Sequence, residues 1–254
     1  MTRGGFEPEA ERRDAASLEC RTFDTRRDAE RELACEIAEL VRCRPDAVLG
    51  LATGNTPTGL YRELVRMHRE DGLDLGHVRT FNLDEYDVLP SNHPLSFRAW
   101  MTEHLFGPAG IPAENTHFPS DGSACARFEA SIREVGGIDL LLLGIGRNGH
   151  VAFNEPGSPR DSRTRRVALH PWTREDASRL FQGLEHVPSH AFTMGVATIL
   201  DAKRLRMLAF GPGKRALVAR TLSTVCDDAW PASHVHGHPD ARLYVDRDAS
   251  PISA

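Results

Sequence analysis

The sequence has few features that would indicate a membrane protein, a disulfide-rich protein or a zinc protein. No stretch of its 254 residues approaches the roughly 20 apolar residues of a membrane-spanning helix. Its five cysteines are scattered, odd in number and without a C-x-x-C pair, so neither a disulfide framework nor a zinc site is indicated. Free thiols are typical of a reducing compartment, which predicts a cytoplasmic protein.

The sequence also lacks a strong charge of either sign. The 31 Lys and Arg residues stand against 36 Asp and Glu residues, for a formal net charge of −5. Such a balance produces no overall field that would attract nucleic acid or anionic lipid, so we expect neither as a partner. Any anionic ligand must therefore be held by a local arrangement of residues.

One folded domain preceded by a short polar segment is the predicted organisation. Residues 1–20 are charged and lack the apolar segment of a signal peptide, so we expect a poorly ordered extension there. Hydrophobic residues make up 40% of the chain, which is enough for the core of a single domain at 21–254. No internal repeat or low-complexity linker divides that part.

Strands and helices alternate along the predicted domain, as in α/β proteins with a largely parallel sheet. The apolar run 138–143 is typical of a strand buried on both faces. Ligands of such sheets bind beyond the carboxyl ends of the strands. The predicted strands are 20–23, 47–51, 78–83 ending in Asp84-Glu85-Tyr86, 138–143 and 206–210, and the predicted helices are 24–42, one opening at Thr56-Pro57 and one running from Lys214 through Leu217, Leu222 and Val225.

The loop Leu51-Ala-Thr-Gly-Asn-Thr-Pro-Thr-Gly59 has the composition of a phosphate-binding loop. Its glycines let the backbone approach a ligand, and the free N–H groups of the following helix attract an anion. It lacks the Gly-Lys-Ser/Thr ending of a P-loop, so binding of a nucleoside triphosphate is not indicated. Taken alone, the loop is equally compatible with an ordinary capped turn between strand and helix.

The run Gly144-Ile-Gly-Arg-Asn-Gly149 matches the G-x-G-x-x-G fingerprint of dinucleotide sites, but its context does not. That fingerprint requires a helix, whereas Pro156 and Gly157 follow shortly afterwards. The loop instead displays Asn148, His150 and Glu155 after a buried strand, and a histidine beside a carboxylate is a plausible acid/base unit. A histidine that only caps the strand is an equally good interpretation of the loop alone.

Two further sets of polar residues need an interpretation. Asp84 follows the strand at 78–83 and is suited to accept a proton from carbon, although an isolated Asp more often forms an Asx turn or an N-cap. His234, His236 and His238 alternate as metal ligands can, but alternate residues of a strand followed by a Gly-His-Pro turn produce the same spacing, and we favour that interpretation.

Together these motifs resemble the glucosamine-6-phosphate deaminase family. The resemblance rests on the loop 49–59, on Thr80-Phe-Asn-Leu-Asp-Glu-Tyr86 and on Gly144-Ile-Gly-Arg-Asn-Gly-His-Val-Ala-Phe-Asn-Glu-Pro-Gly157, and it covers nearly everything after residue 20. It implies a modified Rossmann-like α/β fold, with a mostly parallel sheet flanked by helices. It also implies a cofactor-free and metal-free isomerisation of an amino-sugar phosphate, with loss of ammonia to give fructose 6-phosphate.

The resemblance also implies roles for individual residues. Asp84 matches the carboxylate that moves a proton from C2 to C1, and His150 matches the acid/base that opens the sugar ring. Glu155 matches the carboxylate that supports this histidine. Asn148 lies where family members carry either Asp or Asn, and an amide can offer only a dipole, which leaves Glu155 as the main anionic partner of an imidazolium.

For the substrate phosphate, the resemblance implies both the loop and two basic residues. Without it, Arg179 and Lys214 would be interpreted as solvated surface charges. The irregular, charged segment 163–188 is interpreted as a lid that carries Arg179 inward, the alternative being a pair of ordinary surface helices. The implied phosphate contacts are Thr53, Gly54, Asn55, Thr56, Arg179 and Lys214.

Two other functions fit parts of this pattern. A 6-phosphogluconolactonase would share the fold and use the histidine to activate water, but the Asn-Leu-Asp-Glu-Tyr motif argues against it. A sugar-phosphate sensor of a transcription regulator would need a DNA-binding module, and no helix-turn-helix or basic patch precedes residue 20.

Some members of the family that the sequence resembles are homo-oligomers, and a second sugar phosphate that binds between their subunits activates them. Other members differ in oligomeric state. Ser158 and Arg165 match positions that the activated members use. Val167 and Ala168 stand where those members have a lysine and a threonine, so two contacts to the activator are missing. We therefore expect weak coupling between such a site and the active site.

Overall fold

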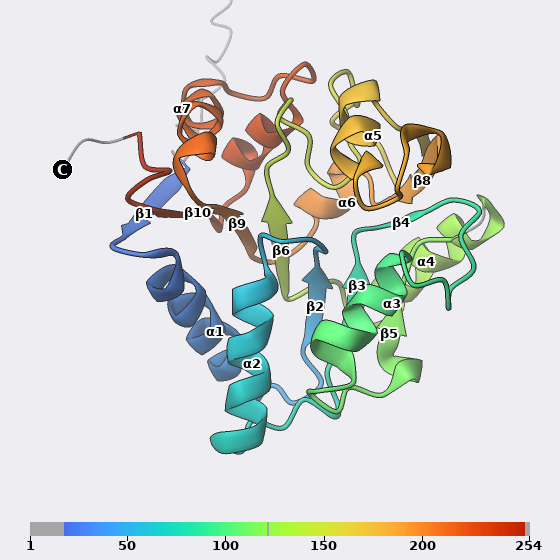
Figure 1. Ribbon diagram of the computed structural model, residues 1–254. Helices are drawn as coiled ribbons and strands as arrows, with labels where there is room; N and C mark the ends of the chain where they lie inside the picture. Colours follow the sequence, from blue (N-terminus) through green and yellow to red (C-terminus); the bar gives the residue numbers. More distant parts are fainter. Residues whose placement is uncertain (1–17, 121, 252–254) are drawn as a thin grey trace, which may run out of the picture.

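A seven-stranded sheet forms the centre of the computed structural model, which describes residues 18–120 and 122–251 (Figure 1). Its strand order is β1-β10-β9-β6-β2-β3-β5, and every neighbouring pair is parallel. The mostly parallel sheet predicted from the sequence is thus confirmed. The strands are β1 (Glu19–Phe23), β2 (Val48–Leu51), β3 (Arg79–Asn82), β5 (Thr116–His117), β6 (Leu140–Gly144), β9 (Leu205–Ala209) and β10 (Ala241–Asp246).

The predicted polar extension at 1–20 falls almost entirely outside the described residues, and β1 already begins at Glu19. Within 18–120 and 122–251, no helix is long and apolar enough to cross a membrane.

A second, antiparallel sheet corrects one prediction. Asp84-Glu85-Tyr86 was predicted to end the strand at 78–83, but these residues form β4 (Asp84–Tyr86), which pairs with β8 (His190–Thr193), itself paired with β7 (Arg165–Ala168). The chain leaves the parallel sheet at Leu83, whose N–H still bonds the carbonyl of Leu51. Residues 84–86 pair with a strand more than 100 residues away in the sequence, so they do not continue the strand formed by the apolar run before them.

Helices cover both faces of the large sheet. The first helix begins where Thr25 and Asp28 form a capping box, since each side chain accepts a hydrogen bond from the other's backbone N–H. The helix after Lys214 ends at Ser223, so Val225, which was predicted to lie in it, is exposed beyond its end. The helices are α1 (Arg26–Cys43), α2 (Thr58–Glu70), α3 (Phe97–Met101), α4 (Gly122–Glu134), α5 (Pro171–Ser178), α6 (Val196–Leu200) and α7 (Arg215–Ser223), with a π-helical turn at Thr102–Phe106 and 3-10 turns at Ala113–Asn115, Leu184–His186, Pro212–Lys214 and Pro231–Gly237.

Alternating side chains of β6 show how the core divides into two layers. Leu140 and Leu142 pack with α1 and α2, whereas Leu141 and Leu143 pack on the opposite face with α4, α6 and α7. Burial on both faces explains why this strand is a continuous apolar run in the sequence. Figure 1 shows α1 and α2 side by side on one face of the sheet.

The histidines at 234, 236 and 238 do not alternate along a strand, so that prediction was wrong. His234 and His236 lie in the 3-10 turn Pro231–Gly237, which opens with a proline that could not donate to a strand ladder. His236 Nε2 is 2.6 Å from the carbonyl oxygen of Thr221, and His238 Nε2 is 2.6 Å from that of Ala202. Both imidazoles are thus engaged with backbone carbonyls.

Candidate active site

The order of the strands places a crevice between the loops that follow β2 and β6. From β2 the chain continues to β3 on one side, and it later adds β6 on the other side. Loops that diverge at such a switch point leave room for a ligand beyond the carboxyl ends of the strands. A cavity of about 210 Å³ lies there, lined by Ala52, Thr53, Thr56, Leu83, Asp84, Phe97, Gly144, Ile145, Gly146, His150, Ala152 and Phe153.

Asp84 contributes the buried carboxyl group of this cavity. It is the first residue of β4, just where the chain leaves the parallel sheet, and only 7% of its surface is exposed. Burial, aided by the negative charge of Glu85, raises the pKa of Asp84 to about 8. A carboxyl group with such a pKa can both accept and return a proton near neutral pH.

Glu85 holds this part of the chain in place. Its Oε1 atom accepts hydrogen bonds from the backbone N–H groups of Tyr86 and Phe97, and its Oε2 atom accepts one from that of Arg98. Burial raises the pKa of Glu85, although these three hydrogen bonds oppose the effect. Glu85 thereby ties β4 to the first turn of α3, a role that sequence reasoning missed.

Two glycines explain how His150 enters the cavity. A β-carbon at Gly146 would lie 2.1 Å from Nε2 of His150, so only glycine leaves room for the imidazole. Gly149 has a φ of +83°, and a β-carbon there would lie 2.3 Å from the ring of Trp230. The glycines of the G-x-G-x-x-G run thus shape a loop around His150, and no helix starts at the last of them, as the sequence predicted.

Glu155 lies behind His150 and is strongly anchored. Its Oε2 atom is 3.3 Å from Nδ1 of His150, within ion-pair distance but without the geometry of a hydrogen bond. Asn148 links the two residues, because its Nδ2 donates to Glu155 Oε2 at 2.8 Å and its Oδ1 accepts from the backbone N–H of His150 at 3.2 Å. Burial alone would raise the pKa of Glu155, but contacts with His150, Thr173 and Asn148 outweigh it and lower the pKa to about 2.

The segment 163–188 contributes directly to this cluster. It contains β7, α5 and a 3-10 turn, rather than the irregular chain or the pair of surface helices that were considered. From α5, Thr173 Oγ1 donates to Glu155 Oε1 at 2.6 Å, and Glu175 pairs with Arg147 at 2.8 Å. The sequence carried no signal for Thr173, because the contact depends on how α5 packs against the loop after β6.

The predicted phosphate loop lies at the mouth of the same cavity. Thr53 and Thr56 line the cavity, whereas Gly54 and Asn55 are exposed beside it. Gly54 has a φ of +97°, which turns the chain before α2 begins at Thr58. The loop therefore offers hydroxyl groups and the N-terminus of a helix to an anion.

Of the two predicted basic residues, only Lys214 lies against the cavity wall. Its Nζ donates to the carbonyl oxygen of Ile145 at 2.6 Å. Burial lowers the pKa of Lys214, although the nearby charge of Asp176 opposes this shift. Arg179 is exposed at the end of α5 and does not line the cavity.

Arg26 supports the phosphate loop from behind and was missed by sequence reasoning. Its Nη2 atom donates to the carbonyl oxygens of Asn55 and Thr56 at 2.7 and 3.1 Å. Its Nε atom donates to Glu30 at 2.7 Å, and that carboxylate lies where a β-carbon of Gly59 would be. The first turn of α1 thus fixes the backbone of the loop.

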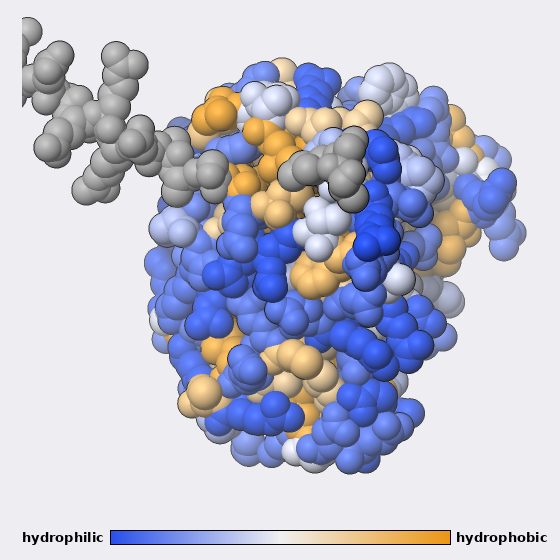
Figure 2. Space-filling model, turned by 90° about the vertical axis from the view of Figure 1, so that its left-hand side faces the viewer, coloured by the Kyte–Doolittle hydropathy of each residue, from blue (hydrophilic) through white to orange (hydrophobic). Residues whose placement is uncertain are grey.

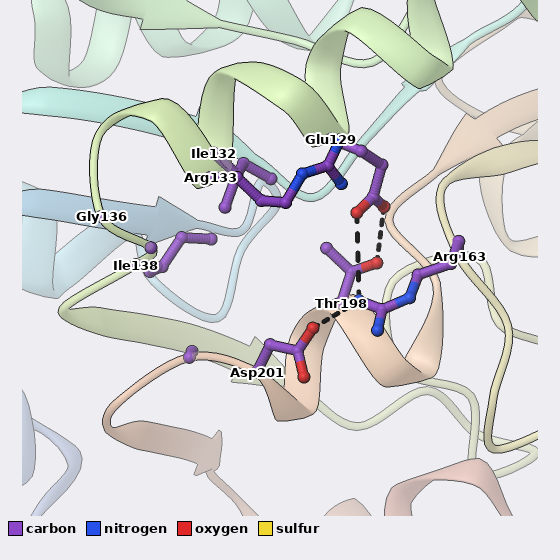
Figure 3. Close-up of a pocket in the computed structure, with 10 residues that line it drawn as sticks. Glu129, Ile132, Arg133, Gly136, Ile138, Arg163, Thr198 and Asp201 are labelled. Atoms are coloured by element: carbon purple, nitrogen blue, oxygen red, sulfur yellow. Dashed lines mark hydrogen bonds and ion pairs between the residues drawn. The ribbon is translucent and has the colours of Figure 1, made fainter.

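A second cavity, of about 470 Å³, lies at the opposite end of the large sheet, near the residues that precede β6. Figure 3 shows Glu129 of α4 facing Thr198 of α6, with Arg163 beside Asp201. Glu129 accepts hydrogen bonds from Thr164 and Thr198, and Arg163 forms an ion pair with Asp201. The two acidic residues of this cavity are thus engaged by neighbouring side chains, and none of the site residues predicted from the sequence lines it.

Metal-ion ligands are not grouped in the described part of the chain: within 18–120 and 122–251, no three His, Cys, Asp or Glu side chains are arranged to hold an ion. The metal-free, cofactor-free reaction remains a prediction.

These features define an α/β protein with an acid/base pair and an anion loop at the carboxyl ends of parallel strands. The model of the family of glucosamine-6-phosphate isomerases and 6-phosphogluconolactonases matches residues 23–244, and the chain belongs to this family. It is 48% identical over 227 residues to glucosamine-6-phosphate deaminase 1 of Giardia intestinalis, with 87% of this chain and 85% of that protein covered. It is 39% identical over 242 residues to glucosamine-6-phosphate deaminase 1 of Bacillus subtilis (strain 168), with 92% and 98% covered.

Solved structures agree with this assignment. A monomeric glucosamine-6-phosphate deaminase is similar with a TM-score of 0.88 at 37% identity, covering 91% of this chain and 98% of that one. A 6-phosphogluconolactonase from Thermotoga maritima has a TM-score of 0.68 at 21% identity, covering 91% and 99%, and this likeness concerns the fold alone. The family resemblance and the fold class inferred from the sequence are confirmed.

Proposed function

We propose that this chain is a glucosamine-6-phosphate deaminase, which converts glucosamine 6-phosphate and water to fructose 6-phosphate and ammonia. The observation that carries the proposal is that Asp84 and His150 line one cavity together with Thr53 and Thr56. A proton-transfer carboxyl, a ring-opening histidine and an anion anchor are the parts that this reaction needs. The deaminases among the relatives support the choice of substrate.

In the proposed mechanism, His150 first opens the sugar ring by moving a proton between the C1 hydroxyl and the ring oxygen. Ionised Asp84 then removes the proton from C2 while a proton of the substrate's ammonium group moves to the C1 carbonyl oxygen, which gives an enolamine with a hydroxyl group at C1 and a double bond between C1 and C2. Asp84 returns its proton to C1, leaving a protonated imine at C2. Water adds to this iminium carbon, and the nitrogen leaves as ammonia when the added hydroxyl loses its proton and the C2 ketone forms.

The residues around His150 support its role. The carboxylate of Glu155, with a pKa of about 2, remains ionised and stabilises an imidazolium on His150. Asn148 holds both the carboxylate and the backbone of His150, and so orients them without adding charge. A rigid arrangement of this kind keeps the acid/base group in the geometry that proton transfer requires.

At the other end of the substrate, the phosphate binds Thr53, Gly54, Asn55 and Thr56, with Lys214 as its cationic contact and Arg179 as a second one. Lys214 exchanges its bond to the carbonyl of Ile145 for a bond to the phosphate. Arg179, exposed at the end of α5, reaches the phosphate when α5 moves over the cavity. We further propose that the reaction uses no cofactor or metal ion and serves the breakdown of N-acetylglucosamine in the cytoplasm.

The two alternatives differ from this proposal in their products. A 6-phosphogluconolactonase would use His150 to activate water, but five lactonases of similar structure share only 16–21% identity with the chain. A sugar-phosphate sensor would bind its ligand without turnover. Incubation with glucosamine 6-phosphate and, separately, with 6-phosphogluconolactone distinguishes all three: ammonia from the first supports the proposal, and acid release from the second alone contradicts it.

A further inference from the structure

A groove of about 590 Å³ lies between α1 and α2, apart from the cavity that holds Asp84 and His150. Its walls carry five arginines and two glutamates. The residues that line it are Arg26, Arg27, Glu30, Arg31, Gly59, Arg62, Glu63 and Arg66.

The two glutamates of the groove are already neutralised. Glu30 pairs with Arg26 at 2.7 Å, and Glu63 pairs with Arg66 at 2.8 Å. Arg66 also binds Asp71 at 2.9 Å. These pairs account for both carboxylates of the groove and for two of its five guanidinium groups.

The other three guanidinium groups have no acidic partner in the part of the chain that the structure describes. They belong to Arg27 and Arg31 on α1 and to Arg62 on α2, and all three residues are exposed. Arg27 and Arg31 are four residues apart and therefore neighbours on one face of their helix. Arg62 and Arg66 have the same spacing on α2, so two short rows of arginines border the groove.

The surroundings favour a charged ligand over an apolar partner. Figure 2 shows that the face of the molecule around α1 is predominantly hydrophilic. Guanidinium groups bind phosphate oxygens through paired hydrogen bonds, which makes rows of arginines suited to phosphate groups. The three positive charges of Arg27, Arg31 and Arg62 exceed the charge of a single phosphate, and they match a chain of two or three phosphates.

We propose that this groove, defined by Arg27, Arg31 and Arg62, is a second anion-binding site that takes a ligand with a polyphosphate chain. It is separate from the substrate cavity, since the two share no lining residue. Nothing in the deamination reaction requires such a site, so its ligand is a further molecule and not the substrate.

Isothermal titration calorimetry with inorganic tripolyphosphate at about 0.15 M salt tests the proposal, because weak surface attraction is largely screened there. The triple variant Arg27→Ala/Arg31→Ala/Arg62→Ala should bind at least about tenfold more weakly than the wild type, since each lost guanidinium removes charge-assisted hydrogen bonds. The control Arg42→Ala/Arg69→Ala/Arg133→Ala removes the same charge from exposed sites outside the groove and should bind as the wild type does.

Tripolyphosphate could also enter the substrate cavity, so the same titration is made on Lys214→Ala. Retained binding in this variant, together with loss in the groove variant, supports the second site. The proposal is overturned if the wild type does not bind, if Lys214→Ala abolishes binding, or if both triple variants weaken it equally. Circular dichroism melting curves show whether each variant is folded, and substrate turnover of the groove variant should equal that of the wild type.

Discussion

Nδ1 of His150 lies 3.3 Å from Oε2 of Glu155, and Thr173 holds the other oxygen of that carboxylate at 2.6 Å. Glu155→Gln keeps the shape of the side chain but removes the charge that stabilises an imidazolium. We expect kcat to fall by about 100-fold, at the lower end of what acid/base catalysis contributes, with little change in KM. Steady-state kinetics measure this effect. Glu39→Gln, an exposed carboxylate on α1, is the control, and a Glu155→Gln enzyme within twofold of the wild-type kcat would contradict the role.

The raised pKa of Asp84 predicts the pH dependence of the reaction. Asp84 must be ionised to accept the C2 proton, and its pKa is about 8 in the free enzyme. The value of kcat/KM should therefore rise about tenfold per pH unit below pH 8 and level off above it. Glu85→Gln removes the neighbouring charge that raises this pKa, so the rise should move to lower pH. A wild-type profile that is flat from pH 5 to pH 8 would show that Asp84 is not the titrating base.

Substitution of the two predicted basic contacts should act on substrate binding. Lys214→Ala and Arg179→Ala each remove a charge-assisted hydrogen bond to the phosphate, worth about 1.5–3 kcal/mol, which corresponds to roughly 10- to 150-fold in KM. The exposed Arg133→Ala serves as the control. An unchanged KM in both variants would place the phosphate elsewhere, and an effect of Lys214→Ala alone would show that α5 does not bring Arg179 to the phosphate.

Patterns in the sequence predicted the residues that lie at strand ends. Thr53 and His150 lie in the loops that follow apolar strands, and the carboxyl ends of parallel strands meet at one edge of a sheet. Those residues therefore came together as expected from local sequence alone. The turn that places Asp84 in a second sheet was not predicted, because β4 has only three residues and its partner β8 is far away in the chain.

Supporting residues could not be found in the same way. Arg26 reaches the phosphate loop across 29 positions, and Thr173 reaches Glu155 across 18. Both are half-buried residues in the first turn of a helix, where a polar residue needs no special explanation. Only the packing of α1 and α5 against the loops shows that Arg26 holds the phosphate loop and that Thr173 holds Glu155.

Regulation by a second sugar phosphate should be absent. Arg165 binds Asn154 and Ser158, at 2.9 and 3.2 Å, while Val167 and Ala168 offer an activator neither charge nor hydroxyl. The adjacent Arg166 cannot replace the missing lysine in this arrangement, since it pairs with Asp87 at 2.6 Å. We expect hyperbolic substrate kinetics that N-acetylglucosamine 6-phosphate leaves unchanged.

Initial rates measured over a range of substrate concentrations, with and without that compound, test this expectation. Sigmoidal kinetics that become hyperbolic when it is added would contradict it, because an effector can act only through different affinities for two states.

The most direct test of the proposed function is the release of ammonia and fructose 6-phosphate from glucosamine 6-phosphate by the wild type and by Asp84→Asn. The amide preserves the shape of the buried side chain but cannot accept the C2 proton. The wild type should form both products in equal amounts, whereas Asp84→Asn should bind the substrate with similar affinity in calorimetry and lose most of its turnover. A wild type that forms neither product, or an Asp84→Asn enzyme with near-wild-type turnover, would contradict the account.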